Sequence, residues 1–306
     1  MTKNVQEHIV IFSHGMGVLK DSRGIFTEIG DTLGKSGIQP VLFDYSDYNP
    51  QTKEVTVTPF SEQAMRLHTV IRETRRDHPN AIIDIVAHSQ GAVAVALAKP
   101  KDVRKTILLA PFFHTDIEEV RQRHSKHAIG GVDFSKTTRR KRSDGTITII
   151  PPAYWTERFN TPVSELYNAL ALKTELTIIN ASEDEIMDST NLARIYNATI
   201  LNIQSNHEFE GAVRTRLKKR YCIFCRHSLQ EELFSIKLRR GLIKWQNKRL
   251  ILKYLANLSV LAQKATLKEA LRKRLVYLRS NSYENHLVIY NFKVLKKSSH
   301  TCKDMN

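Results

Sequence analysis

The 306-residue sequence has little cysteine and no long hydrophobic run, and each shortage excludes a class of protein. Its three cysteines are too few for a disulfide framework and all fall after residue 220, which favours a reducing compartment. The most apolar stretch, residues 81–98, contains Asp84 and His88, which would be costly to place in hydrocarbon. The first residues do not have the pattern of a secretory signal. We therefore expect a soluble, cytoplasmic protein without a transmembrane segment.

Proline and glycine are scarce only in the last third of the chain. Residues 214–306 contain no proline and a single glycine, Gly241, although the whole sequence has 9 prolines and 12 glycines. The charge changes at the same place. Residues 1–213 hold 24 Lys and Arg against 26 Asp and Glu, whereas residues 214–306 hold 23 against 5. This shift predicts a domain boundary near residue 213, with the basic residues in a separate extension.

Short apolar runs alternate with helical patterns in the first 213 residues, which is typical of a parallel sheet covered by crossover helices. Most runs are continuously apolar, as expected of strands buried on both faces. The predicted strands are 8–12, 41–44, 82–87, 105–110, 176–180 and 199–203. The predicted helices are 22–35, 61–76, 90–98, 163–172 and 189–196. The fold class is therefore α/β, with a mostly parallel, doubly wound sheet of about six strands whose ligands bind beyond the carboxyl ends of the strands.

The sequence Ala87-His88-Ser89-Gln90-Gly91 follows a predicted strand and opens a helix of small residues. A serine in such a turn is held in a strained conformation that lifts its hydroxyl clear of the sheet, as in a nucleophile elbow. Ala87 replaces the first glycine of the G-x-S-x-G pattern and adds only a methyl group. Ser89 is therefore a candidate nucleophile, and its alternative role is to cap the helix that follows.

A glycine-containing loop, SHGMG at residues 13–17, follows the first predicted strand. Acyl transfer needs backbone N–H donors where the oxyanion develops, and glycines let such donors approach the site. We expect the N–H groups of Met16 and Gln90 to be these donors. The imidazoles of His14 and His88 are expected to support the two loops rather than to act as bases.

An acidic loop and a histidine follow the last two predicted strands. The first loop contains Asp184 and the second contains His207. A serine hydroxyl needs an imidazole to take its proton, and the imidazole needs a carboxylate to fix its tautomer. Asp184 is preferred as the acid because the apolar pair Ile186-Met187 can anchor its loop. The local rivals for the acid are Glu183, Glu185 and Asp188.

The motifs SHGMG, AHSQG, the Asp184 loop and SNHEF resemble the α/β-hydrolase superfamily in order and spacing, over about residues 8–220. The resemblance implies Ser89 as nucleophile, His207 as base and then acid, Asp184 as orienting acid, and no cofactor. It also implies that the chain starts at the family's third strand. The expected function is a serine hydrolase that cleaves a small carboxylic ester or thioester through an acyl-enzyme. Amides, lactones and carbon–carbon bonds stay open as alternatives.

Residues 111–162 lie where this family usually inserts its lid. A hairpin is predicted to turn at Asp144-Gly145, with the run Arg139–Arg142 on or near the turn. We expect this run to be a solvated tip, with contact to an anionic substrate as the alternative. Apolar residues of the insertion fit either a pocket roof or core packing. The candidate substrate-binding residues are His14, Phe112, Phe113, Tyr154 and Trp155.

The basic residues 214–306 have no counterpart in the family beyond one closing helix. A capping-box pattern at 228–231 and the spacing of later leucines predict helices. Such helices bind anionic membrane or nucleic acid in some proteins, so the alternative function is a non-catalytic scaffold that binds through this tail. A solvated face or an extension without a catalytic role is also compatible. The CxxC at 222–225 has no second pair at a recognised spacing, so we predict no metal site.

Overall fold

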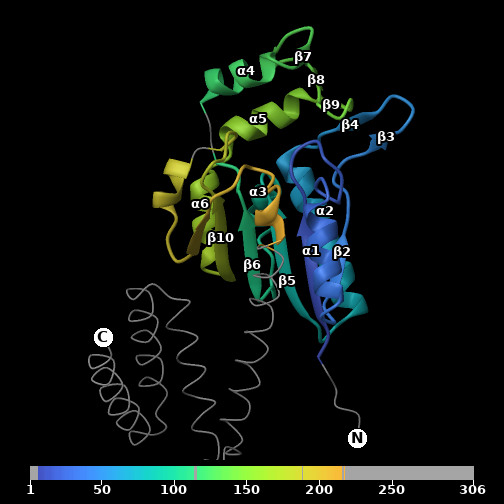
Figure 1. Ribbon diagram of the computed structural model, residues 1–306, viewed down its shortest axis with the longest axis vertical. Coiled ribbons are helices and arrows are strands. Elements are labelled where there is room, and N and C mark those ends of the chain that lie inside the picture. The colour runs from blue at the N-terminus through green and yellow to red at the C-terminus, as the bar shows by residue number, and fades with distance from the viewer. Residues whose placement is uncertain (1–5, 114–115, 188, 216, 218–306) are drawn as a thin grey trace, which may run out of the picture. The chain divides into compact units, whose positions relative to one another are not determined.

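A computed structural model describes residues 6–113, 116–187, 189–215 and 217 (Figure 1). These residues belong to one compact unit, Met1–Gln230. The predictions for the basic tail, including its helices and the CxxC, lie outside the described residues. None of the helices within the described ranges combines the length and the apolarity needed to span a bilayer.

The main sheet has six strands, and every pairing in it is parallel. All six predicted strands are present, each within two residues of its predicted bounds. Their order across the sheet is β11 (Thr199–Ile203), β10 (Glu175–Ala181), β6 (Lys105–Leu109), β5 (Ile82–His88), β1 (His8–Ser13) and β2 (Gln39–Leu42). Because β1 and β5 are buried at every residue, the polar groups that follow them project from the centre of the sheet edge.

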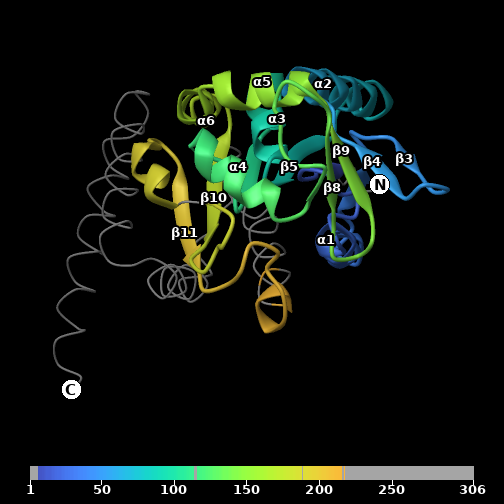
Figure 2. The same cartoon turned by 90° about the horizontal axis from the view of Figure 1, so that it is seen from above.

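Helices cover both faces of this sheet (Figure 2). One face carries α2 (Phe60–Asp77), α3 (Gly91–Ala98) and α6 (Val163–Ala171), and the other carries α1 (Ile25–Gly34). A separate hydrophobic cluster fills each interface. These four helices were predicted.

The predicted helix at 189–196 is instead a short 3-10 helix, η1 (Ser189–Arg194). Its segment closes with an i→i−3 hydrogen bond, from Ile195 N–H to Leu192 O at 3.0 Å. A segment this short favours the tighter 3-10 turn over an α-helix, and the prediction of a longer helix was wrong for this reason.

A second sheet of five strands was not predicted as a sheet. Its order is β3 (Tyr48–Asn49), β4 (Glu54–Thr56), β9 (Ile147–Ile150), β8 (Thr138–Lys141) and β7 (Ala128–Ile129). Strands β8 and β9 form the hairpin predicted around Asp144-Gly145. Strand β4 joins this hairpin through a parallel pairing with β9, although it precedes the elbow in the chain.

This second sheet lies with α4 (Ile117–Ser125) and α5 (Pro152–Asn160) above the main strands, beyond their carboxyl ends (Figure 1). We call the second sheet and these two helices the roof. The roof therefore takes most of its residues from the predicted insertion and the rest from the β3–β4 hairpin.

The carboxylate inside the apolar β5 strand, Asp84, is buried, and both of its oxygens accept hydrogen bonds. It accepts hydrogen bonds from His8 Nε2 at 2.8 Å, from the Arg104 guanidinium and from Lys105 N–H at 3.2 Å. Burial opposes its ionisation, yet the bonds from His8 and Arg104 hold the pKa of Asp84 below its usual value. This cluster ties β5 to β1 and β6, near the end of the sheet opposite the polar loops.

Candidate active site

Ser89 stands directly after β5 with a positive backbone φ of 53°, a strained conformation for a residue with a side chain. Its carbonyl accepts from Phe112 N–H at 3.1 Å, and its N–H donates to Leu109 O at 2.9 Å. Gly91 makes the turn possible, because a Cβ there would lie 2.6 Å from His14 O and closer still to Ser13 O. The local structure is therefore the strand-turn-helix elbow that the sequence predicts.

His207 and Asp184 lie together on the loops that follow β11 and β10. The distance from His207 Nδ1 to Asp184 Oδ2 is 2.7 Å, and each side chain is 4% exposed. The other oxygen of Asp184 accepts from the N–H groups of Ile186 and Met187 at 2.7 and 2.8 Å. Burial opposes the charge of Asp184, but the hydrogen bond with His207, together with those from the two N–H groups, holds its pKa below the usual value. A carboxylate there fixes the proton of His207 on Nδ1 and leaves Nε2 as an acceptor.

The alternatives for the acid occupy different positions. Glu183 and Glu185 are exposed, and Glu183 Oε1 accepts from Gln204 Nε2 at 2.7 Å. Asp188 lies outside the described residues. Among the described carboxylates, Asp184 is the one that contacts the His207 ring.

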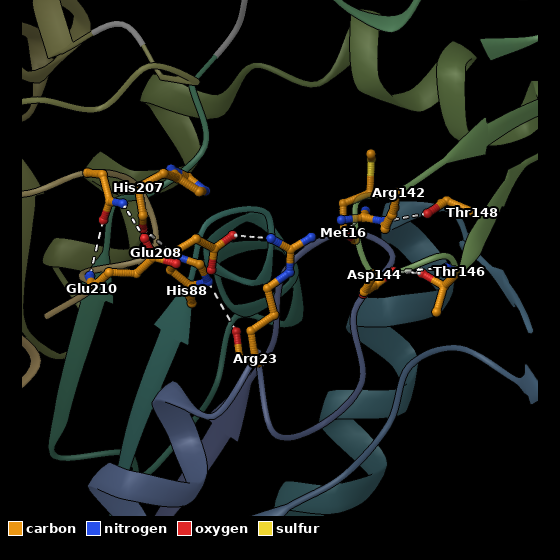
Figure 3. Close-up of polar contacts among 12 residues, drawn as sticks. Met16, Arg23, His88, Arg142, Asp144, Thr146, Thr148, His207, Glu208 and Glu210 are labelled. Atoms are coloured by element: carbon orange, nitrogen blue, oxygen red, sulfur yellow. Dashed lines mark hydrogen bonds and ion pairs between the residues drawn. The ribbon is translucent and has the colours of Figure 1, made fainter. Parts of the chain in front are cut away.

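His88, the residue before Ser89, lies against His207 (Figure 3). Burial, reinforced by the nearby His207, lowers the pKa of His88 to about 3, so the ring is neutral. Its Nε2 lies 3.0 Å from the carbonyl of His207, which can only accept, so the single proton is on Nε2. Its Nδ1 then accepts from the Ser22 hydroxyl at 3.1 Å.

His14 is bonded to backbone groups in and beside the SHGMG loop. Tyr45 N–H donates to His14 Nε2 at 3.0 Å, so Nδ1 carries the proton and donates to Gly15 O at 2.9 Å. Burial lowers the pKa of His14, which keeps the ring neutral.

Gln90, one of the two predicted oxyanion donors, is the N-cap residue of α3, where backbone N–H groups have no partner within the helix.

One small pocket is lined by the elbow, the SHGMG loop and the loops that follow β10 and β11. Its volume is about 110 Å³, and its lining includes Met16, Ser89, Gln90 and His207. Phe112 also lines it. The remaining candidate substrate-binding residues are outside that lining: His14, Phe113, Tyr154 and Trp155.

Tyr154 does not line the pocket but contacts residues that do, and it is fully buried. Its hydroxyl lies 2.7 Å from Gln90 Oε1 and 3.0 Å from Met16 Sδ, and it accepts from Arg158 at 3.0 Å. Trp155 packs against the rings of His124 and Phe134. These aromatic residues support the pocket wall from α5.

The pocket also contains residues that sequence reasoning missed. Arg123, His124, Arg158 and Glu208 line it, together with Arg140 and Arg142 of the basic run. The expectation of a solvated tip is therefore wrong for Arg140 and Arg142, because both line the pocket and are only partly exposed. The spacing of Tyr154 and Arg158, four residues apart on one helix face, is a signal that would have placed Arg158 beside the predicted roof. Within the described ranges, no cluster of three His, Cys, Asp or Glu side chains is arranged to hold a metal ion.

Residues 5–142 match a sequence family described as serine aminopeptidase, S33. No curated protein matches the sequence. Three solved structures are similar in fold. Est1E from Butyrivibrio proteoclasticus is 15% identical over 75% of this chain and 91% of its own, with a TM-score of 0.55. The esterase domain from a Rhodothermus marinus protein is 15% identical over 74% and 89%, with a TM-score of 0.51. The Pyrococcus furiosus esterase Pf2001 is 14% identical over 73% and 84%, with a TM-score of 0.50.

At these identities the similarity to solved structures shows the fold. The parallel sheet, with the elbow at its centre and the two polar loops after its last strands, has the architecture that the motifs predict. The matched sequence family covers the strands and helices on both sides of that elbow. The chain therefore has the fold of these esterase structures, and its residues 5–142 are similar to the serine aminopeptidase family.

Proposed function

We propose that the protein is a serine hydrolase that cleaves a carboxylic ester or thioester through an acyl-enzyme intermediate. The observation that carries this proposal is one pocket lined by both Ser89, strained at φ 53°, and His207, whose Nδ1 is bonded to Asp184. Ser89 lines the pocket, and the bond to Asp184 leaves His207 Nε2 able to take the hydroxyl proton.

In the proposed reaction, His207 Nε2 takes the proton of Ser89 as its Oγ attacks the acyl carbonyl carbon. Asp184 stabilises the imidazolium that forms, without taking its proton. The backbone N–H groups of Met16 and Gln90 bind the oxyanion, and each such donor contributes about 10²–10³ in rate. His207 then gives the proton to the leaving alcohol or thiol. A water molecule, deprotonated by His207, cleaves the acyl-enzyme and regenerates Ser89.

Ester cleavage is preferred over amide cleavage because two of the structures that share this fold are named esterases. Alcohols and thiols also leave a tetrahedral intermediate more readily than amines do. The description of the matched sequence family makes an aminoacyl amide the rival substrate.

The test uses p-nitrophenyl acetate, an alanine p-nitroanilide and a fluorophosphonate probe with the full chain. We expect ester turnover and labelling, both lost in Ser89→Ala and both kept in Ser182→Ala, an exposed serine after β10. Faster turnover of the anilide than of the ester would replace the ester proposal with an amidase. Labelling that persists in Ser89→Ala would refute the assignment of the nucleophile.

A further inference from the structure

The pocket beside Ser89 contains more positive charge than ester cleavage requires. Four guanidinium groups of the roof line it, and among the described lining residues Glu208 is the single carboxylate. Arg23 already contacts Glu208, at 3.4 Å (Figure 3). The four arginines are Arg123 in α4, Arg140 in β8, Arg142 directly after β8 and Arg158 in α5.

None of these four guanidiniums forms an ion pair with a carboxylate in the described part of the chain. Their hydrogen bonds go to neutral oxygens. Arg142 donates to Met16 O and Thr148 Oγ1, each at 2.6 Å, and Arg158 donates to the Tyr154 hydroxyl at 3.0 Å. Arg123 donates to Ile186 O. A neutral oxygen holds a guanidinium in place but leaves its charge uncompensated.

Part of this donor capacity is buried without use. Within the described residues, the Nε atoms of Arg140 and Arg158 are buried and have no hydrogen-bond partner, and Arg158 as a whole is 6% exposed. An unpartnered buried donor on a charged group costs more free energy than a neutral one, so these two donors require a partner that the described residues do not supply.

The arginines also repel one another. Burial, together with Arg23 and Arg123, lowers the pKa of Arg140. Burial, together with Arg23 and Arg140, lowers the pKa of Arg142 to about 10. At this pKa the group is still charged at neutral pH, so the repulsion persists until an anion enters.

The rest of the pocket limits the size of the ligand. Its volume of about 110 Å³ is well below that of a drug-sized site. Val18, Phe112 and Ile186 give it an apolar part, and the guanidinium of Arg158 lies 4.3 Å from the centre of the Phe112 ring. A short hydrocarbon segment that ends in an anion matches this lining.

We infer that the substrate is a small ester or thioester whose acyl group ends in an anionic oxygen group, a carboxylate or a phosphate, bound by the roof arginines while the carbonyl reaches Ser89. The inference rests on the proposed function. Guanidinium forks match the oxygens of both groups. In the reaction the Ser89 Oγ–acyl bond forms, the acyl–oxygen or acyl–sulfur bond breaks, and the leaving group departs with the proton. The distal anion is unchanged.

The test compares mono-p-nitrophenyl glutarate with p-nitrophenyl pentanoate, which replaces the carboxylate with a methyl group. We expect kcat/KM to be at least about tenfold higher for the glutarate, the effect of one charge-assisted hydrogen bond. In Arg140→Met the preference should fall close to one, and in Arg140→Lys it should fall only in part. Equal kcat/KM values in the wild-type protein would overturn the inference.

The matched control is Arg139→Met, which should keep the wild-type preference. Arg139 is adjacent in β8 but does not line the pocket, and its exposed side chain bonds to Glu54. Competitive inhibition by glutarate and by inorganic phosphate, each at constant ionic strength, separates a carboxylate substrate from a phosphate substrate. Loss of the preference in Arg139→Met to the same extent as in Arg140→Met would also overturn the inference, because it would show a general effect of charge.

A failure of the proposed reaction is distinguishable from a failure of this inference. If neither ester shows Ser89-dependent turnover, the proposed reaction is wrong, and the melting temperature then tests the anion site. Glutarate or phosphate should raise it more than sodium chloride of equal ionic strength in the wild-type protein, and not in Arg140→Met. The absence of such a rise would overturn the anion site as well.

Discussion

The imidazole of His88 donates a hydrogen bond to the backbone carbonyl of His207, with 3.0 Å between Nε2 and the oxygen. The residue before the proposed nucleophile therefore holds the backbone of the proposed base. The two rings are also in contact, tilted by 44° with their centroids 4.9 Å apart. Burial lowers the pKa of His88 to about 3, so the ring is neutral at neutral pH, and its burial links the stability of the fold to pH.

Stability should fall as the pH falls from 6.5 towards 4.5. Burial lowers the pKa of His88 and of His124 to about 3, so both are neutral in the folded protein and take up a proton when it unfolds. The unfolded state then binds more protons, and each histidine removes about 1.4 kcal/mol of stability per pH unit below 6.5. Melting temperatures between pH 7.5 and 4.5 check this. His124→Gln should give a shallower slope, and His127→Gln, an exposed neighbour, should keep the wild-type slope.

Replacing Asp184 with Asn should lower kcat for the ester about 10³-fold or more without unfolding the loop. The amide oxygen can still accept from Ile186 and Met187, but the amide NH₂ would face His207 Nδ1 and favour the tautomer whose Nε2 carries the proton. That tautomer cannot deprotonate Ser89. Steady-state kinetics and circular dichroism measure the two effects. Glu183→Gln is the control, and an equal loss in both variants would contradict the role of Asp184.

Gly91→Ala should damage both the fold and the site. Its Cβ would overlap the carbonyls of Ser13 and His14, so the elbow or the SHGMG loop must move. We expect a loss of about 3 kcal/mol of stability and slower fluorophosphonate labelling of Ser89. In Gly34→Ala, at the end of α1, the new methyl group meets no atom within 4 Å. That variant should be neutral or more stable by up to about 1 kcal/mol. A Gly91→Ala protein with wild-type melting and labelling would show that the close contact is relieved without cost.

A chain shortened to end at Gln230 should fold and keep its ester turnover. Every proposed catalytic group precedes residue 208, and about 220 residues bury enough surface for a stable core. The boundary at residue 213 and the separate role of residues 214–306 stay predictions, and this variant tests the role of residues 231–306. A soluble, folded, shortened protein that is still labelled at Ser89 but has lost turnover would show that the tail contributes to the substrate site.

The main sheet could be predicted because most of its strands are nearly continuous apolar runs, and the candidate site because its groups follow those strands directly. The β3–β4 hairpin could not be predicted, because its strands are only two and three residues long. In addition, β4 pairs with β9, which lies about 90 residues later in the sequence. The arginine cluster could not be predicted for a related reason. Arg123, Arg140 and Arg158 come from three elements, and only the folding of the roof brings them together.

The sequence favours Asp184 as the acid over its acidic neighbours only through the apolar pair Ile186-Met187 that follows it. In the structure these two residues act through their backbone, because the N–H groups of Ile186 and Met187 donate hydrogen bonds to the Asp184 carboxylate. Local hydrogen bonds of this kind depend on loop geometry and leave no mark in composition or periodicity.

The pairing of β4 with β9 has a consequence for chimeric proteins. In Figure 1 the β3–β4 hairpin and the β8–β9 hairpin lie in the same layer, and their backbones are joined by bonds such as Val57 N–H to Ile149 O at 2.8 Å. Residues 111–162 therefore do not form a cassette that can be exchanged alone. Their excision would leave β4 as a bare edge open to pairing with another molecule. A functional graft onto a related scaffold must carry residues 48–57 with it.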